Sequence, residues 1–186
     1  MAKQIITAAA LLSMLSVPVL AETHTQSPDE LVTEARAKVQ AFGGSLKQAL
    51  QAAIKEGGLT NGIGVCNTVA PEIAADNSSE EWTISRTSLK VRNPDNAPTD
   101  WQKLQLLAMD KQPVEVWQVS EASGQPAFRY MSAIPTQKLC LGCHGKNIDP
   151  DVKAKLAELY PNDQATGFSE GDLRGAFVVT YQPATK

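Results

Sequence analysis

The segment Cys140-Leu141-Gly142-Cys143-His144 places two thiols and one imidazole at a spacing that suits a specific chemistry. Two thiols separated by two residues can add to the two vinyl groups of one porphyrin. A histidine directly after the second thiol then lies beneath the iron as an axial ligand. A chance match is rare in a chain with only 3 cysteines and 2 histidines. The sequence therefore predicts one covalently bound haem c.

Two other chemistries use cysteine pairs with this spacing. A structural zinc site needs four ligands, and only Cys66 and His24 remain to complete one, far apart in the sequence. A redox dithiol of the thioredoxin type is expected beside a βαβ pattern, and the sequence has none. Both alternatives are weaker than haem attachment.

The N-terminus has the pattern of an export signal. Lys3 precedes an apolar run over residues 5–17, Pro18 ends the run, and small residues lead to Ala21. The run is too short to span a membrane, and no nearby cysteine could carry a lipid. We expect residues 1–21 to be a signal peptide, cleaved after Ala21, and residues 22–186 to form a soluble periplasmic protein without a membrane span. Covalent haem attachment takes place outside the cytoplasmic membrane, so the motif and the signal agree.

Composition limits the class of partner. The chain of 186 residues has 17 basic and 20 acidic residues and a net charge of −3, and loss of the signal removes Lys3. A mildly acidic chain lacks the basic excess expected of a nucleic-acid-binding protein. No repeat or low-complexity tract interrupts residues 22–186, whose length suits one domain with its own core.

The first third of the mature chain has helical periodicity. Ser27-Pro28-Asp29-Glu30 matches a capping box with proline at the first helical position. Gly43-Gly44 is expected to interrupt this helix, and a second helix is expected to end at Gly57-Gly58. A third helical stretch is predicted over residues 61–75, where Pro71 should introduce a kink or a new start.

After residue 80 the pattern changes to strands and short helices. Alternating or apolar β-forming runs predict strands at 82–87, 114–119, 127–131 and 175–181. Short helices are predicted at 99–108, at the Cys-x-x-Cys-His segment and at 149–160, and an irregular loop at 93–98. Helices followed by an antiparallel sheet indicate the α+β class.

Cys66 is the one cysteine that thioether formation leaves over. It could be a small buried apolar residue, or it could form an intermolecular disulfide in an oxidising compartment. It could equally be a second iron ligand, because a thiolate binds iron well. The residues alone leave these alternatives open.

Four motifs occur in an order that resembles a known family. They are residues 66–74, 86–98, 140–145 and 171–176. The chain resembles the PAS-like single-haem c-type cytochrome family, long catalogued as a domain of unknown function, whose members are exported proteins or sensor ectodomains. The resemblance implies a PAS-like antiparallel sheet with an N-terminal helical extension. It also implies an axial pair of His144 and Cys66.

Other residues are weaker ligand candidates. Met109 and Met131 lie in helix and strand patterns where packing in the core is the expected role, and His24 lies near the mature N-terminus. Haem propionates need cationic partners, and Arg86 and Arg92 are favoured because they flank one of the family motifs.

A thiolate ligand would stabilise ferric iron and lower the reduction potential. We therefore expect a redox or small-ligand sensor that passes its signal to a separate protein. The alternative is a low-potential electron-transfer cytochrome in a periplasmic chain with its own redox partner. Two histidines leave few groups for acid–base catalysis, so we do not expect an enzyme.

The attachment motif makes a direct prediction. The haem should stay with the polypeptide through acid–acetone extraction and through denaturing electrophoresis, where it is detected by haem staining. Replacing either Cys140 or Cys143 should weaken attachment, and replacing both should abolish it. Release of the haem from the unaltered protein by extraction would contradict covalent binding.

Overall fold

The computed structural model describes residues 26–112, 114–121 and 127–184; the expected cleavage site and His24 lie outside these ranges. The elements, in chain order, are α1 (Pro28–Asp76), β1 (Trp82–Thr87), η1 (Pro94–Asn96), α2 (Asp100–Met109), β2 (Glu115–Val119), β3 (Phe128–Pro135), η2 (Lys138–Cys140), α3 (Leu141–His144), α4 (Pro150–Leu159) and β4 (Leu173–Tyr181). Helix precedes sheet, and the predicted α+β class is confirmed. Among the described residues, no helix combines the length and apolar character that crossing a membrane requires.

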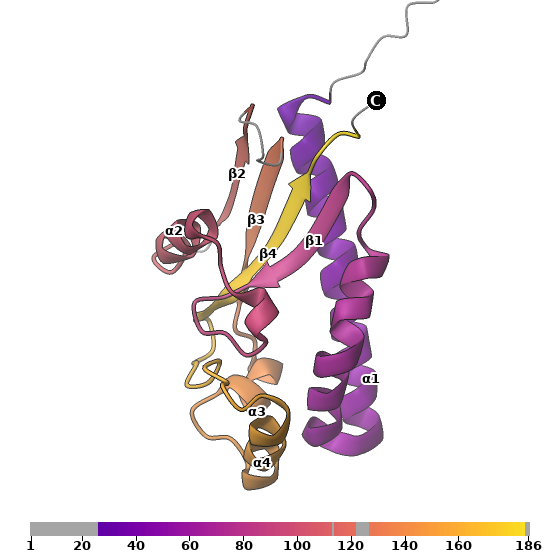
Figure 1. Ribbon diagram of the computed structural model, residues 1–186. Coiled ribbons are helices and arrows are strands. Elements are labelled where there is room, and N and C mark those ends of the chain that lie inside the picture. Colours follow the sequence, from indigo (N-terminus) through magenta and orange to yellow (C-terminus); the bar gives the residue numbers. More distant parts are fainter. Residues whose placement is uncertain (1–25, 113, 122–126, 185–186) are drawn as a thin grey trace, which may run out of the picture.

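The sheet has four strands in the order β1-β4-β3-β2, and every neighbouring pair is antiparallel. No βαβ unit occurs in this sheet, so the setting expected for a thioredoxin-type dithiol is missing from the part of the chain that the structure describes. The connection from β3 to β4 contains η2, α3 and α4, which lie together beyond one end of the sheet (Figure 1). That end therefore carries the Cys-x-x-Cys-His segment.

Each face of the sheet is covered by a helix. The first half of α1 packs on one face, where the core residues are Leu31, Val32, Ala35, Phe42, Trp82, Ile84, Phe128, Tyr130 and Val179. On the other face α2 contributes Leu106 and Met109, which pack with Met131, Ala176 and Val178. Met109 and Met131 are fully buried there, in the packing role that their sequence patterns predict.

Helix α1 runs through Gly43-Gly44 without a break, so the predicted interruption at these glycines was wrong. A Cβ at Gly43 would come within 3.0 Å of the Phe177 ring, which shows that the glycine allows the helix to lie close to β4. Two glycines in a helix interior cost roughly 1–2 kcal/mol, and burial of the adjacent Phe42 offsets this cost. The helix also continues through Pro71, with non-helical dihedral angles only at Gly57 and Gly58.

The predicted end of a helix at Gly57-Gly58 is confirmed as a sharp reversal of α1. Gly58 has φ 73° and ψ −170°, a conformation open essentially to glycine alone. Residues 59–76 then run back along residues 28–56, so α1 forms a helical hairpin (Figure 1). Gly62 lets the two halves approach closely, because a Cβ there would lie 3.0 Å from the Leu50 and Ile54 side chains. The hairpin presents Cys66 beside the end of the sheet.

The two glycine sites should respond oppositely to alanine. Gly58→Ala should lower the free energy of unfolding by ~1–3 kcal/mol, because alanine cannot adopt this conformation without strain. Gly44→Ala should raise it by ~0.5–1 kcal/mol, because the site is helical and a Cβ meets nothing within 4 Å. Urea unfolding followed by circular dichroism measures both. Equal effects of the two substitutions would contradict the location of the reversal.

Candidate functional site

A cavity of about 460 Å³ lies beyond the end of the sheet, between the second half of α1, the chain after β1, and α3. Most of its lining is apolar, but all the residues predicted to form the site face it: Cys66, Arg86, Arg92, Cys140, Cys143 and His144. The first and last of these residues, Cys66 and His144, are 78 positions apart in the sequence. The fold brings them to one place.

Packing against α1 and α4 holds the Cys-x-x-Cys-His segment. Cys143 adjoins a cluster formed by Ile63 of α1 with Ile148, Val152, Leu156 and Tyr160. Gly142 lies so close to α1 that a Cβ would come within 2.9 Å of the Leu59 side chain. The single turn of α3 is thus pressed onto the second half of α1, the half that carries Cys66.

The imidazole of His144 is fixed in one tautomer. Its Nδ1 lies 2.6 Å from the backbone carbonyl oxygen of Ala165, so Nδ1–H is the donor and Nε2 has a free lone pair. Burial, aided by the positive charges of Arg174 and Arg92, lowers the pKa of His144 to about 2. The ring is therefore neutral at physiological pH, which is the form that binds a metal ion.

The chain that follows α4 holds this histidine from outside. The amide of Phe168 donates to the carbonyl of His144 at 3.0 Å, and the amide of Gly167 donates to that of Gly145 at 3.0 Å. The Phe168 ring stands edge-on to the imidazole, with ring centroids 6.4 Å apart. Residues 165–168 therefore pack against His144 and hold its backbone and ring in place.

Cys66 lines the same cavity from the second half of α1, and all three cysteines are free thiols. Burial raises the pKa of the Cys66 thiol, while Arg86, Arg92 and Arg174 oppose this rise through their positive charges. Among the described residues, no group of three or more His, Cys, Asp or Glu side chains could hold a metal ion. The zinc alternative therefore has no ligand set in this part of the chain.

Three arginines line the cavity, and their partners differ. Arg92 forms an ion pair with Asp163 at 2.9 Å and donates to the Cys143 carbonyl at 2.7 Å. Arg174 donates to the Ser88 hydroxyl at 3.3 Å and lies over the Phe168 ring. Arg86 makes no hydrogen bond or ion pair with any described residue, and burial lowers its pKa. Arg86 is thus a buried charge that still lacks a counter-charge.

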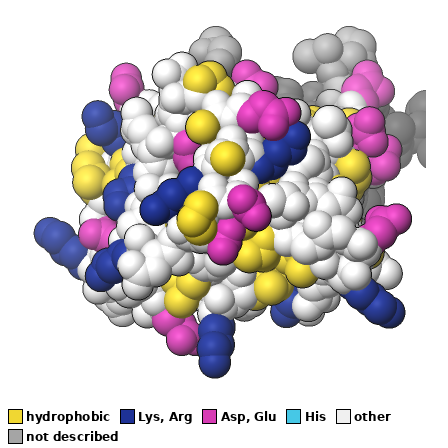
Figure 2. Space-filling view, turned by 90° about the horizontal axis from the view of Figure 1, so that it is seen from below, with side chains coloured by type: hydrophobic (Ala, Val, Ile, Leu, Met, Phe, Trp, Pro, Cys, Tyr) yellow, Lys and Arg dark blue, Asp and Glu magenta, His cyan; other side chains and the backbone are white. Residues whose placement is uncertain are grey.

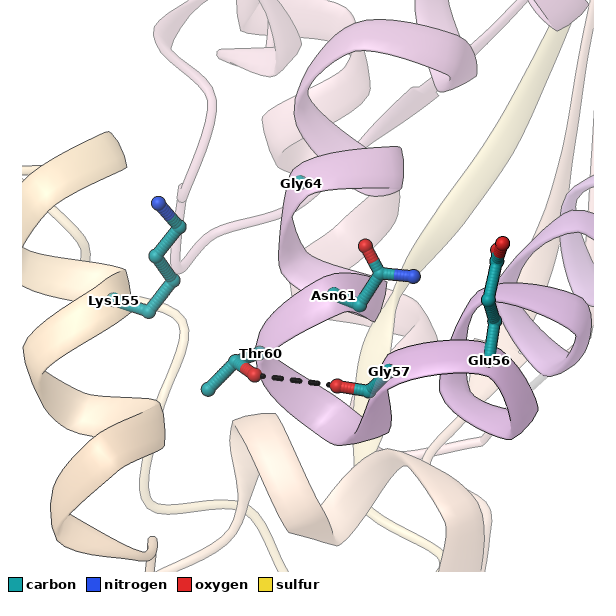
Figure 3. Close-up of a pocket in the computed structure, with 6 residues that line it drawn as sticks. All are labelled: Glu56, Gly57, Thr60, Asn61, Gly64 and Lys155. Atoms are coloured by element: carbon teal, nitrogen blue, oxygen red, sulfur yellow. Dashed lines mark hydrogen bonds between the residues drawn. The ribbon is translucent and has the colours of Figure 1, made fainter.

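A second hollow, of about 650 Å³, opens between the reversal of α1 and α4 (Figure 3). Its lining residues are Glu56, Gly57, Thr60, Asn61, Gly64 and Lys155. The Thr60 hydroxyl donates to the Gly57 carbonyl at 3.5 Å, and the Asn61 amide donates to the Ala53 carbonyl at 3.0 Å. These bonds stabilise the reversal. The hollow is open to solvent, and its lining contains neither cysteine nor histidine.

The surface beneath α1, α3 and α4 carries charges of both signs. Seen from that end of the molecule, Lys and Arg side chains are interspersed with Asp and Glu, and hydrophobic side chains lie between them (Figure 2). No patch of a single sign dominates this face. This face therefore does not have the single-sign charge that steers a strongly charged partner over long distances.

Comparison with known proteins agrees with the fold. A family profile described as Tll0287-like matches residues 8–182. The chain belongs to this family. The solved structure of the cyanobacterial heme-protein Tll0287 is 29% identical in sequence, with a TM-score of 0.61, and the match covers 87% of this chain and 99% of that chain. A search of curated proteins found no match. The resemblance drawn from the four ordered motifs is thereby confirmed.

Several residues of the site have no clear signal in the sequence. Asp163 and Ala165 lie in an irregular segment, and Ala165 acts through its backbone carbonyl, which any residue type provides. Arg174, in the motif at 171–176, is from the sequence one of several candidate cationic partners for propionates, behind the favoured Arg86 and Arg92. The roles of Arg86 and Arg92 as propionate partners stay predictions.

The difference between two arginines can be tested in haem-free protein. Arg86→Met should raise the free energy of unfolding by ~1 kcal/mol or more, because it removes a buried charge without a partner. Arg174→Met is the matched control and should lower it, because the Ser88 hydroxyl and the Phe168 ring lose their partner. Thermal unfolding measures both. A loss of stability in Arg86→Met equal to that in the control would contradict the unpaired state of Arg86.

Proposed function

We propose that the protein is an exported haem protein that senses redox state or a small ligand in the periplasm. In this proposal Cys140 and Cys143 bind one haem c covalently, and His144 and Cys66 are its axial ligands. The observation that carries the proposal is the neutral imidazole of His144, whose Nε2 is bare in the cavity that Cys66 also lines. Kinship with the heme-protein Tll0287 supports haem as the cofactor, and residues 1–21 support export.

The donor set and the cavity suit the group. Two free thiols, one neutral imidazole and one further thiol face a largely apolar space. Haem also carries two propionates, and the unpaired guanidinium of Arg86 is a suitable partner for one of them.

Bound haem supplies a one-electron redox centre and a site for diatomic ligands. The chain determines which of these properties is used. A Cys66 thiolate would favour the ferric state and lower the reduction potential, and the positive charges of Arg86, Arg92 and Arg174 favour the thiolate over the thiol. In this proposal Cys66 binds the iron as a thiolate, and the neighbouring arginines help to keep it in that form.

The position of Cys66 favours a sensor. Cys66 lies on residues 59–76, which join the rest of α1 through the reversal at Gly57-Gly58. Release of the Cys66 thiol would free this half-helix to shift against α3, and that shift would be a structural signal for a separate protein. A low-potential electron carrier is the alternative, and it requires Cys66 to remain bound in both redox states. Among the described residues only one histidine, His144, is present, which leaves few groups for catalysis.

Cys66 is the residue to change. The oxidised wild-type protein should have a low-spin spectrum with thiolate charge-transfer bands. Cys66→Ala should abolish these bands and raise the reduction potential, because the negative charge that favours ferric iron is lost. Cys66→Met should also raise the potential while keeping the iron low-spin. Optical and electron paramagnetic resonance spectra with redox titration measure these changes.

Two outcomes would count against the proposal. An unchanged Soret band and potential in Cys66→Ala would show that Cys66 is a packing residue and not a ligand. If the reduced wild-type protein keeps a six-coordinate low-spin spectrum that Cys66→Ala abolishes, and no small ligand displaces Cys66, the sensor role fails and the electron carrier is favoured. A matched control, Cys66→Ser, keeps the side-chain size and should resemble Cys66→Ala in potential.

A further inference from the structure

The ion pair between Arg92 and Asp163 lies directly behind His144. Both side chains are only 10% exposed. Asp163 uses one carboxylate oxygen for Arg92, at 2.9 Å, and the other accepts the amide of Ala165 at 2.8 Å. Arg92 donates to the Ala165 carbonyl at 3.3 Å, and this same carbonyl accepts Nδ1–H of His144 at 2.6 Å. One peptide carbonyl thus receives both the imidazole and the guanidinium.

This arrangement couples the ion pair to the imidazole in two ways. The first is geometric, since Asp163 and Arg92 fix the orientation of the Ala165 carbonyl and so the plane of the His144 ring. The second is electronic. A positive charge beside a carbonyl oxygen weakens it as an acceptor, and a weaker acceptor leaves the imidazole less electron-rich. The carboxylate of Asp163 offsets the charge of Arg92, so the intact pair is close to neutral.

We propose that Arg92 and Asp163 are positioning residues that set the electron donation of His144 and thereby the reduction potential of the haem. This inference rests on the proposed function. The sequence motif predicts Arg92 as a partner of a propionate, and the proposal adds a second role. The guanidinium of Arg92 is already bound to Asp163 and to the Cys143 carbonyl. Asp163 acts through Arg92 and Ala165 and does not touch the site itself.

The two halves of the pair should shift the potential in opposite directions. Asp163→Asn leaves the charge of Arg92 unbalanced, which weakens the acceptor at Ala165 and disfavours ferric iron, so the potential should rise. Arg92→Gln leaves the charge of Asp163 unbalanced, so the potential should fall. Asparagine keeps an oxygen for the Ala165 amide, and the geometry is thereby preserved. The expected size is roughly tenfold in the one-electron equilibrium, about 59 mV.

The experiment uses purified holoprotein with intact covalent haem. The potentials of wild type, Asp163→Asn, Arg92→Gln and the double variant are measured by redox titration, and their ferric spectra are recorded. Glu158→Gln is the ion-pair control, because Glu158 pairs with Lys155 at the surface at 2.8 Å. Val178→Ala is the stability control, because Val178 is buried on the sheet face covered by α2, away from the cavity lining.

Opposite shifts in the two single variants, a double variant near the wild-type potential and unchanged controls would support the proposal. A merely structural pair loosens the histidine in either variant, so shifts of the same sign, or none, would overturn it. If Asp163→Asn yields no holoprotein, Arg92→Gln decides alone, with Arg92→Lys as the variant that should restore the potential. A wild-type protein without covalent haem would instead contradict the proposed function.

Discussion

An imidazole binds a metal ion through a nitrogen that carries no proton. Its other nitrogen then carries the ring proton and needs a fixed hydrogen-bond acceptor. The Ala165 carbonyl is this acceptor, 2.6 Å from Nδ1 of His144. Burial already disfavours the protonated ring, and the neighbouring arginines disfavour it further. Asp163 accepts the amide of Ala165, and Arg92 donates to its carbonyl. The amides of Gly167 and Phe168 bind the segment that follows Ala165 to the carbonyls of Gly145 and His144.

The long hairpin of α1 links this site to the core. Its first half packs on the sheet through residues such as Phe42, and its second half packs on α4 through Ile63. The reversal at Gly57-Gly58 therefore determines where Cys66 lies relative to His144, although neither glycine touches the cavity centre. Ile73 and Ala74 of the second half also pack on the sheet cluster, so the stretch that carries Cys66 lies between two packed ends.

Local signals in the sequence predicted local features. The predicted capping box at Ser27 is present: the Ser27 hydroxyl accepts the Glu30 amide, and the Glu30 carboxylate accepts the Ser27 amide. The alternation in β1 and the apolar run in β4 also predicted strands. The prediction at Gly43-Gly44 was wrong because tertiary packing against Phe177 overrides intrinsic helix propensity. The contacts of the Ala165 carbonyl with Arg92 and His144, and of Asp163 with Arg92, could not be predicted, because they join residues far apart in the chain.

The charges that line the cavity are not balanced by the polypeptide alone. Of the arginines that line it, Arg92 is neutralised by Asp163, Arg174 has only neutral partners, and Arg86 has no partner among the described residues. Lys90 and Asp95, at the exposed rim, can be solvated by water and need no compensation. Keeping the unpaired guanidinium of Arg86 beside an apolar space is costly for the chain alone. An anionic group that enters the cavity would offset this cost, as the propionates and the Cys66 thiolate of the proposed haem site would do.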